Sequence, residues 1–190
     1  MKIETIEVAG LAGALTALRL PFGKEVRSDM NLAHDNYRGR PFDENVFAWD
    51  KRQYIVVKDK DLTLMQTLVK RGDEHAKVVR GIMVWAKITA PVYWWCEEET
   101  YRRGHERLAS ESTMHIDCRG LAGSELQEAK SAIPMGKELT KVDMFSYQAL
   151  RKMVAQRHNH RLPEWHQFID WVRTLPLAEE LIFVGLETEK

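Results

Sequence analysis

The chain has 190 residues, 44% of them hydrophobic and 29% charged, and its 28 basic side chains equal its 28 acidic side chains in number. This length suits one hydrophobic core, so we predict a single domain over residues 1–190. The formal net charge of zero excludes a whole-molecule electrostatic preference for nucleic acid or for an anionic membrane, so any anion site must be local.

The first half of the chain predicts two strands and two helices. Alternating polar and apolar residues predict a strand over 2–8, and an Ala- and Leu-rich stretch predicts a helix over 11–20. Polar residues with Gly and Pro predict a loop over 24–50, followed by a strand over 53–58. Apolar residues at helical spacing predict a helix over 61–72, capped by its first residue, an aspartate.

The second half is predicted to be mostly helical after one further strand. The strand covers residues 82–89, and a Pro-initiated helix follows over 90–101, with acidic residues close enough to its start to suit the helix dipole. A polar helix is expected over 124–132. Two helices with apolar faces are expected over 145–156 and 163–175.

These elements define the expected fold class and compartment. We predict an α+β fold, in which a small, mostly antiparallel sheet from strands 2–8, 53–58 and 82–89 packs against helices. Two cysteines are too few for a disulfide framework, and no apolar run approaches the roughly 20 residues that span a bilayer. We therefore expect a cytoplasmic protein with no membrane and no nucleic-acid partner.

Chemically versatile side chains concentrate in three segments, residues 72–80, 101–119 and 151–161. The last two carry an excess of basic residues, and the third contains four cations and two histidines without an acid. If they converge, they form a local pocket for a phosphorylated small molecule. The competing interpretation is that these basic runs are solvated helix ends, which the helix dipole favours by itself.

Other site chemistries find less support in the sequence. No histidine pair has the His-Glu-x-x-His spacing of a helical metal site, and we predict no metal. Ser110 and Ser112 lack the glycine-flanked turn of a hydrolase nucleophile. Cys96 and Cys118 each lack a neighbouring resolving cysteine, which disfavours a redox pair.

The order of the segments resembles the flavin-dependent thymidylate synthases, especially short divergent relatives of the phage type. Residues 14–23 are similar to the family's first helix and its Arg-x-Ser-Phe ending, and residues 64–75 resemble its helix with a Gly-His-Glu-Thr-Pro type of turn. Residues 90–93 resemble an Ala-Pro-x-Phe helix start. Residues 157–165 resemble the family's Arg-x-x-x-His-x-x-x-Glu segment.

The chain departs from the family in its signature, Arg-His-Arg-x-x-Ser-x-x-Glu-x-Ser-x-Arg. One alignment places residues 105–110 on the first six signature positions and keeps Arg107 and Ser110. The other places residues 102–103 on the initial Arg-His and Ser112 on the later Ser. Neither alignment preserves the whole motif.

The resemblance implies a role for each candidate residue. In the family the protein orients and polarises the uracil ring of dUMP while reduced FAD delivers a hydride. The implied catalytic residues are Arg157, Ser110 and Ser112. The implied substrate-binding residues are Arg102, Arg107, His105, His160 and Arg161. The implied cofactor-binding residues are His75, Arg80, Arg103 and His115.

Three functional hypotheses follow. The first is an FAD-dependent thymidylate synthase, a methyltransferase acting on dUMP or a related pyrimidine nucleotide, with NADPH and methylenetetrahydrofolate as co-substrates and a homotetrameric assembly. The second is a noncatalytic relative that binds a nucleotide or flavin, which the altered signature favours. The third is an unrelated binding protein whose basic segments are solvated helix ends.

Overall fold

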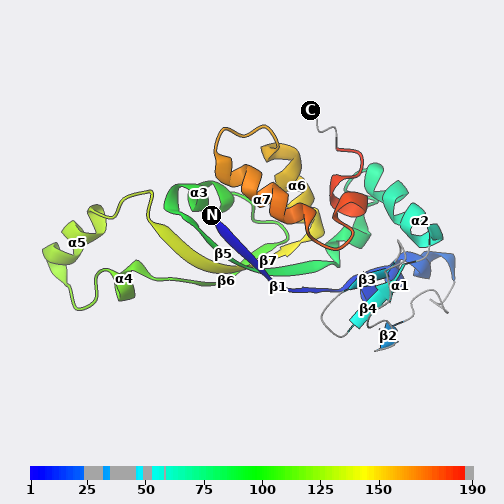
Figure 1. The fold of residues 1–190 in the computed structure, drawn as a ribbon, viewed down its shortest axis with the longest axis horizontal. Coiled ribbons are helices and arrows are strands. Elements are labelled where there is room, and N and C mark those ends of the chain that lie inside the picture. Colours follow the sequence, from blue (N-terminus) through cyan, green and yellow to red (C-terminus); the bar gives the residue numbers. More distant parts are fainter. Residues whose placement is uncertain (24–31, 35–45, 49–52, 58, 187–190) are drawn as a thin grey trace.

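The computed structural model describes residues 1–23, 32–34, 46–48, 53–57 and 59–186. Its centre is a four-stranded antiparallel sheet in the order β1-β5-β7-β6 (Figure 1). The strands are β1 (Lys2–Ala9), β5 (Met83–Pro91), β7 (Glu138–Ser146) and β6 (His105–Ser110). The predicted α+β class with an antiparallel sheet is confirmed.

Helices cover one face of this sheet (Figure 1). They are α3 (Val92–Glu98), α6 (Tyr147–Arg157) and α7 (Pro163–Arg173). Every second residue of β5 is buried, and α3 and α7 supply Trp94, Trp165 and Phe168, whose rings lie 5.1 to 5.7 Å apart. The apolar residues whose helical spacing predicted the last two helices are therefore the residues that pack into the core.

A second group of helices lies towards the end of the sheet where β1 leaves it (Figure 1). They are α1 (Leu11–Arg19), α2 (Asp59–Lys70) and the short turns η1 (Leu20–Phe22), η2 (Lys77–Arg80) and η3 (Glu179–Phe183). The prediction that Asp61 caps α2 is wrong, because α2 begins two residues earlier. Asp61 is buried and forms an ion pair with Arg19 of α1.

Two strands of the main sheet, β6 and β7, were not predicted. Because β6 is polar and lies at the edge of the sheet, its sequence does not show the apolar face that would indicate a strand. β7 contains Lys141 and Asp143 at inward positions, which masks its alternation. The predicted start of the following helix at Phe145 is also wrong, because Phe145 lies in β7. Helix α6 begins at Tyr147, and Ser146 caps it by accepting a hydrogen bond from the Ala149 amide.

The predicted strand at 53–58 exists as β4 (Gln53–Val56), but it does not join the main sheet. It pairs instead with β2 (Leu32–His34) and β3 (Val46–Ala48) in a separate three-stranded sheet. The prediction of a loop over 24–50 is therefore wrong at the residues of these two short strands. The rest of that loop lies outside the described residues.

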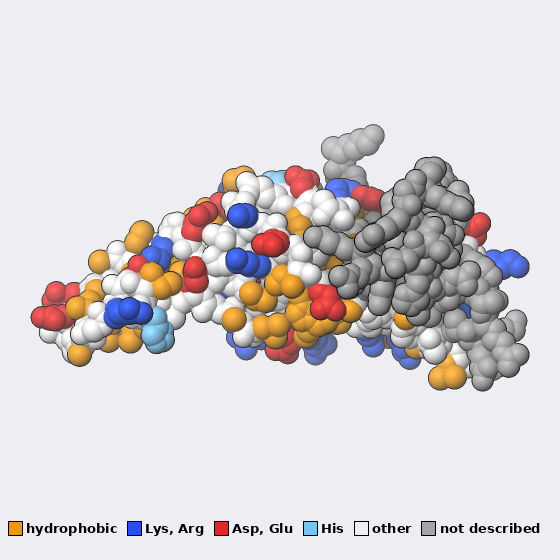
Figure 2. Space-filling model, turned by 60° about the horizontal axis from the view of Figure 1, so that its bottom comes forward, with side chains coloured by type: hydrophobic (Ala, Val, Ile, Leu, Met, Phe, Trp, Pro, Cys, Tyr) orange, Lys and Arg blue, Asp and Glu red, His pale blue; other side chains and the backbone are white. Residues whose placement is uncertain are grey.

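A long excursion joins β6 to β7, and we call residues 111–137 the arm. It carries α4 (Thr113–Ile116) and α5 (Gly123–Ser131), neither of which contains a buried residue, and it extends away from the sheet (Figure 1). Figure 2 shows apolar side chains gathered on it. The large exposed apolar residues of the arm are Met114, Ile116, Leu121 and Met135.

Among the described helices, none is long and apolar enough to cross a membrane.

Gly10 is required where α1 begins. Its φ is +95°, and a Cβ at this position would lie 1.9 Å from the Gly81 carbonyl oxygen, a backbone atom. We expect Gly10→Ala to reduce the free energy of unfolding by at least about 2 kcal/mol, measured by urea denaturation. Gly13→Ala, in the same helix with nothing within 4 Å, is the control and should stabilise by about 0.5–1 kcal/mol. Equal effects of the two substitutions would contradict this account.

Candidate functional site

Three consecutive glutamates, Glu97, Glu98 and Glu99, lie at the end of α3, and we call them the glutamate run. The prediction that they suit the dipole of the helix start is wrong, because α3 ends at Glu98 and the carboxylates occupy its unfavourable C-terminal end. Their stabilisation comes instead from cations on β6, β7 and the end of α6.

The middle glutamate lies in a buried charge cluster with His105, Arg107 and Asp143. Glu98 and Asp143 are completely buried. His105 Nε2 lies 3.0 Å from Glu98 Oε1 and 3.7 Å from Asp143 Oδ1. Arg107 reaches both carboxylates, with Nη2 3.2 Å from Glu98 Oε2 and Nε 3.3 Å from Asp143 Oδ1. The cluster joins the end of α3 to the two strands that the sequence did not reveal.

One further carboxylate, Glu99, and one further cation, Lys141, lie at the rim of the cluster. Glu99 accepts hydrogen bonds from Arg107 Nη1 at 2.6 Å and from Lys141 Nζ at 2.9 Å. The Lys141 ammonium also lies 4.3 Å from the centre of the Trp95 ring, in cation–π geometry. Three carboxylates thus face two permanent cations, and the missing positive charge falls to His105.

The orientation of His105 supports that assignment. His105 Nδ1 lies 2.8 Å from the Tyr101 carbonyl oxygen, to which it must donate. Nε2 then faces the carboxylates, so a proton, on Nε2 or on a carboxylate oxygen, or a metal cation must lie between them. Glu98, His105 and Asp143 offer ligand atoms within 4.8 Å of one another. Protonation of His105 balances the cluster at zero charge, which favours a proton over a divalent ion.

Burial is the largest influence on the protonation of both partners. It raises the pKa of Glu98 to about 7, even though the charges of His105 and Arg107 oppose this shift. Burial acts to lower the pKa of His105, but the interaction with Asp143 and the charge of Glu98 outweigh it and raise that pKa. Glu98 and His105 therefore both bind protons more tightly in the folded chain.

A second group of contacts surrounds Arg157 at the end of α6. Its Nε donates to the Tyr101 hydroxyl at 2.8 Å, and its Nη1 donates to Glu97 Oε2 at 2.9 Å. The guanidinium also lies 4.8 Å from the centre of the Trp165 ring and 5.6 Å from that of Tyr101. His160 Nε2 lies 3.3 Å from the same Glu97 oxygen. Arg157 is thus fixed by two aromatic rings and a carboxylate.

A polar pocket of about 370 Å³ lies beside both groups. It is lined by Glu99, Tyr101, Arg102, His105, Glu106 and Arg107. Tyr101 and His105 connect it to the Arg157 contacts and to the buried charge cluster. Arg102 is exposed, and no ion pair of its side chain occurs among the described residues, so its charge is available to a ligand.

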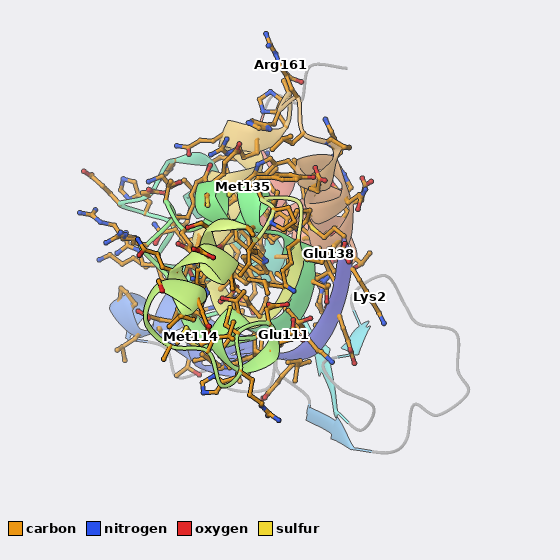
Figure 3. The ribbon with its side chains drawn as sticks, turned by 90° about the vertical axis from the view of Figure 1, so that its left-hand side faces the viewer. Lys2, Glu111, Met114, Met135, Glu138 and Arg161 are labelled. Carbon is orange, nitrogen blue, oxygen red and sulfur yellow. The ribbon has the colours of Figure 1, made fainter. Side chains whose placement is uncertain are left out.

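The structure brings five of the twelve residues proposed from the sequence to this region: Arg102, His105, Arg107, Arg157 and His160. Arg103 is exposed in the adjoining turn before β6. Arg161 is exposed and points outward, away from the helices (Figure 3).

The other five lie elsewhere. Ser110 ends β6 and bonds to the Glu111 carbonyl, while Ser112 and His115 lie at the start of the arm and within α4. His75 is exposed between α2 and η2, and Arg80 donates to the Asp73 carbonyl at 2.6 Å. Within one protomer these five side chains do not surround a common pocket.

The sequence analysis did not identify the acidic residues of this region, its lysine, or the aromatic residues that contact Arg157. The missed residues are Glu97, Glu98, Glu99, Tyr101, Lys141, Asp143 and Trp165. One signal was present in the sequence, since three consecutive acids close to two basic segments indicate charge pairing. Asp143 and Lys141 gave no signal, because their roles depend on the β6–β7 pairing.

The chain has the flavin-dependent thymidylate synthase fold. A thymidylate synthase X (ThyX) structure from Helicobacter pylori with FAD and dUMP matches with a TM-score of 0.65 and 11% identity over 100% of both chains. A second structure of that flavin-dependent enzyme with FAD and dUMP has a TM-score of 0.64 and 12% identity, covering 98% of this chain and 99% of that one.

A third structure extends the likeness to a related enzyme. The UMP/dUMP methylase PolB from Streptomyces cacaoi, bound with 5-Br dUMP, matches with a TM-score of 0.59 and 11% identity, covering 98% of this chain and 93% of that one. No protein-family model and no curated protein sequence matches the chain. The resemblance first noted in short motifs is therefore present in the whole fold.

The buried charge cluster should make stability depend on pH. Glu98 and His105 bind protons more tightly in the folded chain, so their protonation stabilises the fold. This contribution to the free energy of unfolding is complete below the unfolded pKa values of 4.5 and 6.5, and it is lost as pH rises through the higher pKa values of the folded chain. Between pH 5.5 and 8.0, we expect the wild-type Tm to fall by about 5 °C more than that of Glu98→Gln, or roughly 2 kcal/mol.

The control for this experiment is Glu106→Gln, which changes an exposed carboxylate one residue from His105. Its thermal melts should follow the wild-type pH dependence. Parallel pH profiles for wild type and Glu98→Gln would show that the cluster does not titrate as described.

Proposed function

We propose that this protein binds a pyrimidine nucleotide, dUMP or a close relative, and methylates it with reduced FAD as hydride donor. The observation that carries the proposal is the match over nearly the full chain to two structures with FAD and dUMP and to a UMP/dUMP methylase. NADPH and methylenetetrahydrofolate are the co-substrates that this reaction would need.

The pocket beside β6 fits the nucleotide part of this proposal. Its volume of about 370 Å³ lies within the range of small-ligand sites. Arg102 supplies an exposed, permanently charged fork, and guanidinium groups bind phosphate oxygens in bidentate geometry. Tyr101 and His105 line the same pocket.

The residues that the resemblance assigns to FAD do not lie together in one protomer. The four residues assigned to FAD, which are His75, Arg80, Arg103 and His115, come from three separate regions of the structure. A second copy of the chain is therefore part of the proposal, and a homotetramer would allow these residues to combine across subunits. The exposed apolar side chains of the arm give such an assembly a surface to bury (Figure 2).

A cytoplasmic location, in the host cytoplasm for a phage-encoded protein, belongs to the same proposal. Nucleotide substrates are cytoplasmic metabolites, and both Cys96 and Cys118 are free thiols.

A noncatalytic nucleotide-binding relative is the second candidate. One observation favours it: Arg107 and Arg157, two of the arginines implied to bind or act on the nucleotide, already have carboxylate partners in the same protomer. A phosphate must then compete with these glutamates, which lowers affinity relative to unpaired arginines.

The two candidates differ in flavin binding. We expect the absorption bands of FAD to shift when the purified protein is added and to shift again when dUMP is added, because neighbouring ligands alter the flavin environment. Visible absorption titration measures both steps, with buffer lacking protein as the control. Binding of dUMP without any effect on FAD would support the noncatalytic candidate, and absence of both would contradict the proposal.

Arg102 should contribute to nucleotide affinity. We expect Arg102→Ala to raise the Kd for dUMP by about tenfold or more, since a charge-assisted phosphate contact contributes about 1.5–3 kcal/mol. Isothermal titration calorimetry measures the change, with Arg71→Ala, an exposed arginine after α2, as the matched control. An unchanged Kd for Arg102→Ala would remove Arg102 from the site.

A further inference from the structure

Three hydrogen-bond donors converge on a single oxygen of Glu97. Arg157 Nη1 and Trp165 Nε1 each lie 2.9 Å from Glu97 Oε2, and His160 Nε2 lies 3.3 Å from it. The donors come from α6, α7 and the loop between them, and the oxygen comes from α3. We call the three donor groups the Arg157 site.

The donors are held in place by contacts that do not involve Glu97. His160 Nδ1 accepts a hydrogen bond from the Leu162 amide at 3.2 Å, so Nε2 carries the proton and points to the site. The Trp165 side chain is completely buried. The Tyr101 hydroxyl and two ring faces fix Arg157. The Arg157 site would therefore keep its shape when Glu97 leaves it.

Glu97 itself is held through one oxygen only. Its side chain is 33% exposed, on the last turn of a short helix. Its other oxygen, Oε1, has no hydrogen bond or ion pair among the described contacts. Rotation of this flexible side chain towards solvent would uncover the donors without unfolding α3.

A phosphate group matches the three donors better than the carboxylate does. One carboxylate oxygen has about two lone pairs for three donors, whereas a phosphate monoester offers three strong acceptor oxygens and up to two negative charges. Tyr101 lines the nucleotide-sized pocket and also hydrogen-bonds Arg157, so the two places adjoin.

We infer that Glu97 is an internal ligand of the Arg157 site, which the phosphate of the bound nucleotide must displace, so that Glu97 sets affinity for the phosphate part of the ligand. This inference rests on the proposed function and adds a specificity-determining residue to it. The exchange replaces one anion by another and forms no covalent bond.

The substitution Glu97→Gln tests the inference, because glutamine keeps an acceptor oxygen and the shape but removes the competing charge. We expect the Kd for dUMP, measured by isothermal titration calorimetry, to decrease about tenfold, the effect of losing one charge-assisted contact. The Kd for deoxyuridine, which lacks the phosphate, should not change. Glu4→Gln, an exposed carboxylate on β1, is the matched control and should leave both constants unchanged.

Further measurements distinguish the possible failures. An unchanged or higher Kd for dUMP in Glu97→Gln, with a wild-type thermal melt, overturns the inference, as does an equal change for deoxyuridine. If neither protein binds dUMP, the proposed function fails, and inorganic phosphate then tests the site through tryptophan fluorescence. Tighter phosphate binding by Glu97→Gln than by wild type supports the inference, and equal or absent binding overturns it.

Discussion

The arrangement of the candidate site depends on charge pairing at the end of α3. Glu97, Glu98 and Glu99 occupy the helix end where the dipole disfavours carboxylates, and Glu98 has no access to solvent. Such carboxylates persist only when cations or protons compensate them. The cations come from β6, β7 and α6, so the glutamate run joins the edge of the sheet to the helices that cover it.

The same pairing determines what the protein offers to an anion. Net neutrality required any anion site to be local, and the structure shows that most cations near the pocket already have carboxylate partners. Arg102 differs, because it is exposed at the pocket wall. In the proposed function, affinity for a phosphate would therefore reflect a competition between internal and external anions. Removing one partner of a buried ion pair costs more than the pair contributes to stability.

The arm adds a different constraint. Its two helices bury none of their own residues and expose several large apolar side chains, so it gains little from packing within one protomer. A second copy of the chain would give these side chains a partner, and it would also bring the separated flavin candidates within reach of one site. Assembly and cofactor binding are thus linked in the proposed function.

Local pattern determined much of this protein. Helical apolar spacing located α7 and most of α6, alternation located β1, and the basic segments drew attention to Arg102, Arg107 and Arg157. Only the tertiary structure decided the strand order, the separate sheet of β4 and the partners of the arginines. The physical reason is that β6 and β7 carry charges at buried positions, and such charges are stable only when pairing brings Asp143 and Lys141 to the glutamate run from over 40 residues away. No local signal encodes that proximity.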